Sequence, residues 1–96
     1  MQIWKWTLDR CDQQTLRLPT GARLLTVQMQ GSSPCLWALC DETSSGPKEP
    51  RTIALYGTGH QIFNKEPGEY IATFQTKGGI FVWHAFELKL PAVCKR

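Results

Sequence analysis

The sequence predicts a small all-β domain, either an antiparallel sandwich or a small barrel of about six to seven short strands. Three observations lead to this prediction. The 96 residues are the length of one domain, and 42% hydrophobic with 20% charged residues is a globular composition. Short runs rich in β-branched and aromatic residues are separated by Gly, Pro, Ser and Asp. Few stretches have the period of an amphipathic helix. We therefore expect a single domain over residues 1–90 and a flexible tail over residues 91–96.

The strands that we expect lie over residues 3–8, 14–18, 23–30, 35–40, 51–56, 69–76 and 80–90. In the first of them, Trp4 and Trp6 would share one face. In the third, Leu25, Val27 and Met29 alternate with polar residues, which is the pattern of a half-buried antiparallel strand. These patterns favour strands that bury one face and leave the other in water.

Three further stretches bear on the fold. The run Cys35–Cys40 is apolar on both faces, so we expect a central strand that is covered on both sides. The pair Gly78–Gly79 lies between two strand-like runs and tolerates positive φ, which predicts a tight hairpin turn. Short helices around Asp9–Gln14 or Gln61–Glu66 stay open, although neither is long enough to define the fold.

The charge balance and the N-terminal residues restrict the class of protein. A net charge of +3 is too mild to predict a nucleic-acid partner. The first residues lack the basic and long apolar segments of a signal peptide, and no apolar run approaches the roughly 20 residues of a membrane helix. We therefore expect a cytosolic protein without a membrane partner, in which Cys11, Cys35, Cys40 and Cys94 are reduced thiols.

The stretch Tyr56–His60, YGTGH, is the candidate ligand-binding motif. It has neither the lysine of a phosphate-binding Walker loop nor the third glycine of a dinucleotide fingerprint. Two interpretations stay open. Gly57 and Gly59 could expose backbone amides as an anion-binding nest, with Thr58 and His60 as side-chain donors. They could instead supply the turn or bulge that ends a strand, and this second interpretation is favoured.

Catalytic and metal-binding chemistry finds little support in the sequence. No serine lies in a nucleophile elbow, no cysteine is linked to a histidine by spacing, and we expect the carboxylates of the loops to be solvated. Cys35 and Cys40 would point to opposite faces of one strand, so they cannot share a metal ion. His84 lies on an apolar face, where we expect its ring to be hydrogen-bonded to a carbonyl or a hydroxyl. The sequence therefore predicts a protein that is not an enzyme and has no metal or cofactor.

The aromatic residues are numerous for a chain of this length. Phe81 and Trp83 would share one face of the last strand, opposite His84. Rigid rings are favoured at binding sites and can stack on a base while an arginine meets a phosphate. The alternative is that the rings lie in the core of a sandwich or between copies of the chain. The candidate ligand-binding residues are Tyr56, Gly57, Thr58, Gly59, His60, Arg51 and Trp83.

Five segments occur along the chain in this order: IWKWTL, LPTGARLLTVQMQ, PCLWALCDE, YGTGHQI and EYIATFQTKGGIFVWHAFE. Together they resemble a family of short uncharacterised proteins that tailed bacteriophages and prophages encode. The resemblance covers residues 1–88, and its most specific parts are PCLWAL, YGTGH and VWHAFE. No catalytic residues are assigned in that family, so none are carried over to this chain.

The resemblance implies a context for the function. Small phage proteins without enzyme motifs are often accessory proteins that bind a host factor, a defence component or the nucleotide signals of antiviral systems. We therefore expect a protein that counteracts host antiviral defence in the host cytoplasm by non-catalytic binding, with a small anionic, nucleotide-like ligand as the favoured partner. The alternatives are an inhibitor that docks on a host enzyme or CRISPR-type complex, and a minor virion or assembly protein. We also expect a homo-oligomer.

Overall fold

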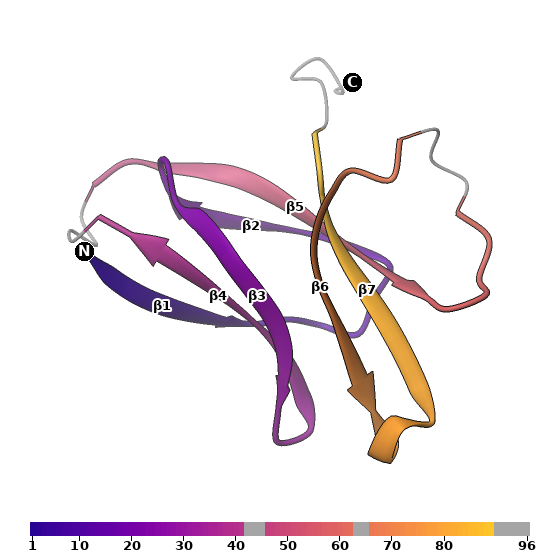
Figure 1. Cartoon of the computed structure of the whole chain (residues 1–96). Helices are drawn as coiled ribbons and strands as arrows, with labels where there is room; N and C mark the ends of the chain where they lie inside the picture. Colours follow the sequence, from indigo (N-terminus) through magenta and orange to yellow (C-terminus); the bar gives the residue numbers. More distant parts are fainter. Residues whose placement is uncertain (42–45, 63–65, 90–96) are drawn as a thin grey trace.

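Seven strands and one short turn make up the computed structural model, which describes residues 1–41, 46–62 and 66–89. The strands are β1 (Gln2–Thr7), β2 (Gln13–Pro19), β3 (Arg23–Gln30), β4 (Ser33–Cys40), β5 (Lys48–Gly57), β6 (Glu69–Thr76) and β7 (Phe81–Leu88), and a 3₁₀ turn, η1 (Lys77–Gly79), joins the last two. The prediction of an all-β fold is confirmed (Figure 1). The predicted flexible tail, residues 91–96, lies outside the described residues.

The strands form two antiparallel sheets. One has the order β1-β4-β3, and the other has the order β2-β5-β7-β6. The edge strands β3 and β6 lie side by side, so the two sheets approach each other along this border (Figure 1). The molecule measures 40 × 34 × 17 Å, and the short dimension fits two stacked sheets about 10 Å apart. The architecture is therefore a sandwich of three strands on four.

One hydrophobic core lies between the sheets. Leu36 and Val27 come from the three-stranded sheet and Leu18 and Ile53 from the four-stranded sheet, and each has 0% of its surface exposed. Burying a side chain of this size contributes about 1.5–3 kcal/mol. Partly buried residues, among them the tryptophans of β1, pack against this cluster from its border. The core therefore fixes the two sheets on each other and sets the positions of the loops at both ends.

A β-bulge in β3 changes the alternation that the sequence predicts. The register of β3 on β4 shifts between Leu24 and Thr26, so Leu25 is the extra residue. A bulge inverts the alternation of side chains on one side of it. Leu24 packs against the core together with Val27 and Met29, whereas Leu25 is 39% exposed. The prediction that Leu25 faces the core is therefore wrong.

Strand β4 is central in its sheet, as expected, and its outward face is covered in part. On that face Cys35 is buried, whereas Trp37 and Leu39 are half-buried. Strand β5 is buried on both faces over residues 52–55. No helix forms at residues 9–14, because the chain bends there and enters β2. None forms in the described part of residues 61–66, and no described segment is a helix that could cross a membrane.

Candidate functional site

The YGTGH stretch ends β5 in a β-turn. The His60 amide donates to the Gly57 carbonyl over 3.0 Å, and Gly59 has φ of 85°. Positive φ at the third residue of a turn is the requirement of a type II turn, and glycine meets it without strain. The geometry agrees with the favoured interpretation, a turn at the end of a strand.

The amides of Thr58 and His60 and the hydroxyl of Thr58 are bonded within the fold. The Thr58 amide donates to the Val82 carbonyl over 3.0 Å, and the Thr58 hydroxyl lies 2.7 Å from Nε2 of His84. The His60 amide is likewise occupied by Gly57. Because an anion nest needs several amides that point at the ligand, this turn offers a phosphate little.

The same turn brings the His60 ring to Trp83. Gly57 is the register partner of Trp83 on β7, and a Cβ atom at Gly57 would lie 2.6 Å from Nδ1 of His60. Glycine is therefore required for the imidazole to cover the end of β5. The two rings meet edge to face, with centroids 6.1 Å apart, and the Trp83 indole donates to the Thr76 hydroxyl over 3.2 Å. This hydrogen bond fixes the tryptophan ring in place.

Two cavities share the rings of Phe81 and Trp83 as a wall. The first, which we call the turn pocket, measures about 300 Å³ and is also lined by Gly57, Thr58 and His60. Phe81 is 49% exposed, so a large apolar surface faces solvent here. Four predicted site residues thus meet at one cavity.

The second cavity, which we call the loop pocket, opens between the two sheets and adjoins the turn pocket at Phe81 and Trp83. It measures about 200 Å³, and its remaining lining comprises the β1–β2 loop residues Arg10, Cys11 and Asp12, the core-side residues Pro34, Leu55 and Phe74, and Thr76 with Lys77 from the β6–β7 hairpin. Its floor is apolar, and the charges lie on the loop and the hairpin. An apolar cleft with a few polar groups is the usual form of a small-ligand site.

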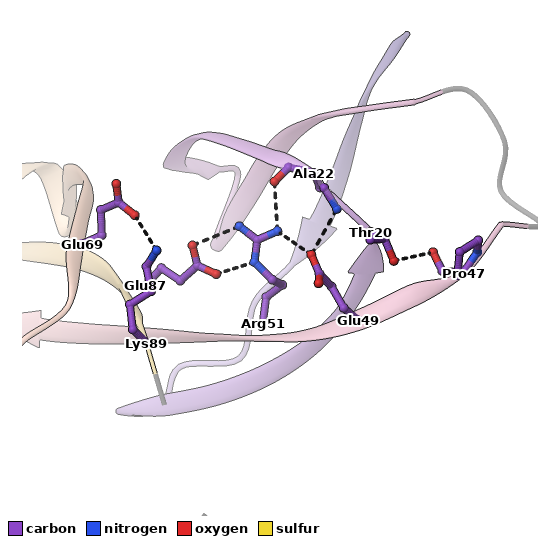
Figure 2. A network of polar contacts seen from close by, with 9 residues as sticks. Thr20, Ala22, Pro47, Glu49, Arg51, Glu69, Glu87 and Lys89 are labelled. Atoms are coloured by element: carbon purple, nitrogen blue, oxygen red, sulfur yellow. Dashed lines mark hydrogen bonds and ion pairs between the residues drawn. The ribbon is translucent and has the colours of Figure 1, made fainter. Parts of the chain in front are cut away.

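Arg51 lies elsewhere, in a network on the side of β5 that faces the core (Figure 2). Its Nε and Nη2 donate to both oxygens of Glu87, and Nη1 donates to the Ala22 carbonyl over 2.9 Å and lies 3.4 Å from Glu49. The Arg51 and Glu87 side chains are 17% and 11% exposed. The hydrogen bond with Glu87 raises the pKa of Arg51 above its ordinary value. At about 3.3 Å per residue along β5, Arg51 lies about 20 Å from Gly57, so the structure does not bring it to the turn.

Tyr56 lies on the opposite face of the sheet. Its ring packs edge-on against Phe86 at 5.6 Å, and its hydroxyl donates to the Pro67 carbonyl over 3.3 Å. His84, on the same face, has Thr58 at Nε2 and the Thr73 hydroxyl 3.1 Å from Nδ1. The expectation that hydroxyls satisfy the His84 ring agrees with this geometry, and Tyr56 contributes to neither pocket.

Arg10, Cys11 and Lys77 are pocket residues that the sequence does not single out. Arg10 is held by its donation to the Ser32 carbonyl in the β3–β4 turn. Within the described part of the chain, Lys77 is the one residue other than glycine with positive φ, at 51°. The Gly-Gly pair beside it predicts the hairpin, and this turn has positive φ at both glycines, but it spans four residues between Thr76 and Phe81.

The thiols differ in access. Cys11 is exposed at the loop pocket, whereas Cys35 and Cys40 are buried, and all three are free. Burial, together with the negative charge of Asp41, raises the pKa of the Cys40 thiol. Cys94 lies outside the described residues. Cys11 is therefore the thiol best placed to report on the site.

Comparison with known proteins identifies a family. No curated protein and no solved structure matches the chain. The model of a domain of unknown function, DUF7352, matches residues 1–94. The chain therefore belongs to the DUF7352 family, whose domain spans nearly its whole length.

Proposed function

We propose that this protein is a non-catalytic binding protein and that the turn pocket holds a small ligand with a flat ring. The observation that carries the proposal is the wall of Phe81 and Trp83, which faces two cavities and is half-exposed at Phe81. Rigid aromatic rings bury a large area at low entropic cost, and they stack on flat ligands without needing a particular hydrogen-bond pattern.

The lining of the turn pocket supports binding rather than catalysis. His60 contacts Trp83 and the end of β5, and the Thr58 hydroxyl is bonded to His84 and to the Val82 carbonyl. A nucleophile with an adjacent base aimed at one point in the cavity is the usual sign of covalent catalysis. Here the Thr58 hydroxyl is bonded to His84 and to the Val82 carbonyl, and the His60 ring packs against Trp83. The His60 imidazole beside the rings of Phe81 and Trp83 can contact the edge or the face of a flat ligand.

The biological context is part of the proposal. The resemblance to phage and prophage proteins supports a role in counteracting host antiviral defence within the host cytoplasm, by holding a nucleotide signal. A protein that acts by stoichiometric binding does not need catalytic groups, and the mainly apolar lining of the turn pocket agrees with this. Assembly into a homo-oligomer remains a prediction of the same account.

A second function is favoured by one observation. Ile80 and Phe81 are 73% and 49% exposed, and both line the turn pocket. Exposed apolar residues that gather at one place mark protein interaction sites. These residues could dock on a host enzyme or a CRISPR-type complex. A minor virion or assembly role has no such feature in its favour.

Thermal melting against a panel of nucleosides, nucleotides and cyclic nucleotides tests the leading proposal. A ligand at a hundred times its Kd stabilises the fold by about 2.7 kcal/mol, which is several degrees for a domain of this size. We expect Phe81→Ala to abolish the shift and Gly57→Ala to weaken it, because the added methyl group displaces His60. Ile3→Ala is the control, since Ile3 is 61% exposed on β1 and lines neither pocket. Absence of a shift with every compound would contradict the proposal and favour a protein partner.

A further inference from the structure

We propose that the ligand is a nucleoside phosphate that spans both cavities, with its ring on Phe81 and Trp83 and its phosphate in the loop pocket between Arg10 and Lys77. This inference rests on the proposed function and adds to it the place of the phosphate and the residues that bind it. It places the phosphate in the loop pocket, which no residue of the YGTGH motif lines.

The size of the two cavities is the first observation. Ligand sites usually measure about 300–1,000 Å³. The turn pocket of about 300 Å³ lies at the lower limit of this range, and the loop pocket of about 200 Å³ lies below it. Because the two cavities adjoin at Phe81 and Trp83, a ring that covers these side chains would place a compact substituent at the mouth of the loop pocket.

The charges of the loop pocket are the second observation. Arg10 and Lys77 face a single carboxylate, that of Asp12, so the lining has an excess of positive charge. In the described ranges the ion pairs are formed by Arg51 and Lys89, and neither Arg10 nor Lys77 has a carboxylate partner. A guanidinium has five N–H donors, and the Ser32 carbonyl fixes Arg10 through one of its terminal nitrogens. The other donors can bind a phosphate in the two-point geometry that arginine favours.

The backbone of Lys77 is the third observation. Its φ of 51° lies in the left-handed region, which glycine adopts freely and residues with a Cβ adopt at a cost. Two glycines follow it directly, so a third would suit the hairpin better than lysine does. Strained residues of this kind gather at functional sites, where the side chain has a use that the turn does not require. The Lys77 side chain lines the loop pocket, and a phosphate gives its ammonium group a partner.

Cys11 provides the experiment, because its exposed thiol lines the proposed phosphate site while the thiols of Cys35 and Cys40 are buried. The four common nucleosides and their 5′-monophosphates are titrated into a Cys94→Ser variant, and the rate of Cys11 alkylation by iodoacetamide is followed alongside calorimetric affinity. We expect one monophosphate to bind at least ten-fold more tightly than its nucleoside and to slow the alkylation of Cys11 at least ten-fold at saturation.

Variants assign the effect to the two cations. Arg10→Ala and Lys77→Ala should each bring the affinity of the monophosphate close to that of the nucleoside, with the affinity of the nucleoside unchanged. Arg17→Ala is the matched control, because Arg17 is an exposed cation on β2 that lines neither pocket, and it should keep the difference. If nucleoside and monophosphate bind equally and Cys11 stays reactive, this inference is overturned and the proposed function stands. If none of the eight compounds binds, this inference is overturned, and the melting panel decides the proposed function separately.

Discussion

Replacing Lys77 with glycine should separate the stability of the protein from its affinity for the ligand. A left-handed conformation costs a residue with a Cβ about 1–2 kcal/mol, whereas the extra freedom of glycine in the unfolded chain costs about 0.5–1 kcal/mol. With φ of 51° at Lys77, the Lys77→Gly variant should be more stable by about 0.5–1 kcal/mol, a rise in Tm of a few degrees. The lost ammonium group should nevertheless weaken the binding of a nucleoside monophosphate by ten-fold or more.

Urea unfolding and calorimetric titration of the same samples check both halves of this prediction. Lys77→Ala is the matched control: it removes the same charge but keeps a Cβ in the left-handed region, so it should bind as weakly as Lys77→Gly without the gain in stability. A Lys77→Gly variant that is less stable than the wild type would refute the argument from strain. Unchanged affinity would refute the assignment of the phosphate.

Three further predictions concern the rest of the fold. Glu87→Ala should destabilise the protein by about 3 kcal/mol in urea unfolding, because it removes the two-point carboxylate partner of the half-buried Arg51 and leaves the longer contact with Glu49. A combined Arg51→Met and Glu87→Leu variant should stay within about 1 kcal/mol of the wild type. The Thr58 hydroxyl donates to the Val82 carbonyl, so it must accept from Nε2 of His84, and His84 should be the Nε2–H tautomer. Imidazole ¹⁵N chemical shifts typical of the Nδ1–H tautomer would disprove this chain of hydrogen bonds. The pKa of Cys40 is raised, so the folded protein keeps the thiol proton to higher pH than the unfolded chain does. The free energy of unfolding should therefore fall as pH rises above 9.0, the ordinary pKa of the thiol. Cys40→Ala should make this decrease with pH smaller.

The strands could be predicted from the sequence because each depends on a local pattern. The sequence predicts that Phe81 and Trp83 share a face opposite His84, and they do, because alternation holds along β7. The same reasoning failed in β3 at Leu25. A bulge depends on how two strands fit together, and nothing in the run RLLTVQMQ marks which residue will be extra. Local periodicity therefore predicts that a strand exists more reliably than it predicts which of its side chains face the core.

The candidate site could be predicted only in part, for a related reason. Gly57 and His60 are neighbours in sequence, so the turn that joins them is visible as a motif. The pairing of Arg51 with Glu87 joins residues 36 positions apart, and it follows from the β5–β7 register rather than from any local signal. The loop pocket is likewise assembled from segments distant in sequence. The sequence Lys77-Gly78-Gly79 does not reveal that Lys77 has positive φ, which only the structure shows.

The central claim, that a ligand binds on the wall of Phe81 and Trp83, is tested most directly by following the Trp83 indole N–H in ¹H–¹⁵N spectra. The signal is assigned with a Trp83→Phe variant, and the protein is titrated with the nucleoside monophosphate that gives the largest shift in melting temperature. The account predicts progressive, saturable shifts of the Trp83 indole and of the Cys11 and Lys77 amides, while the amide of Ile3 on β1, which lines neither pocket, stays unchanged. Shifts confined to residues that line neither pocket, or no shifts at all, would contradict it.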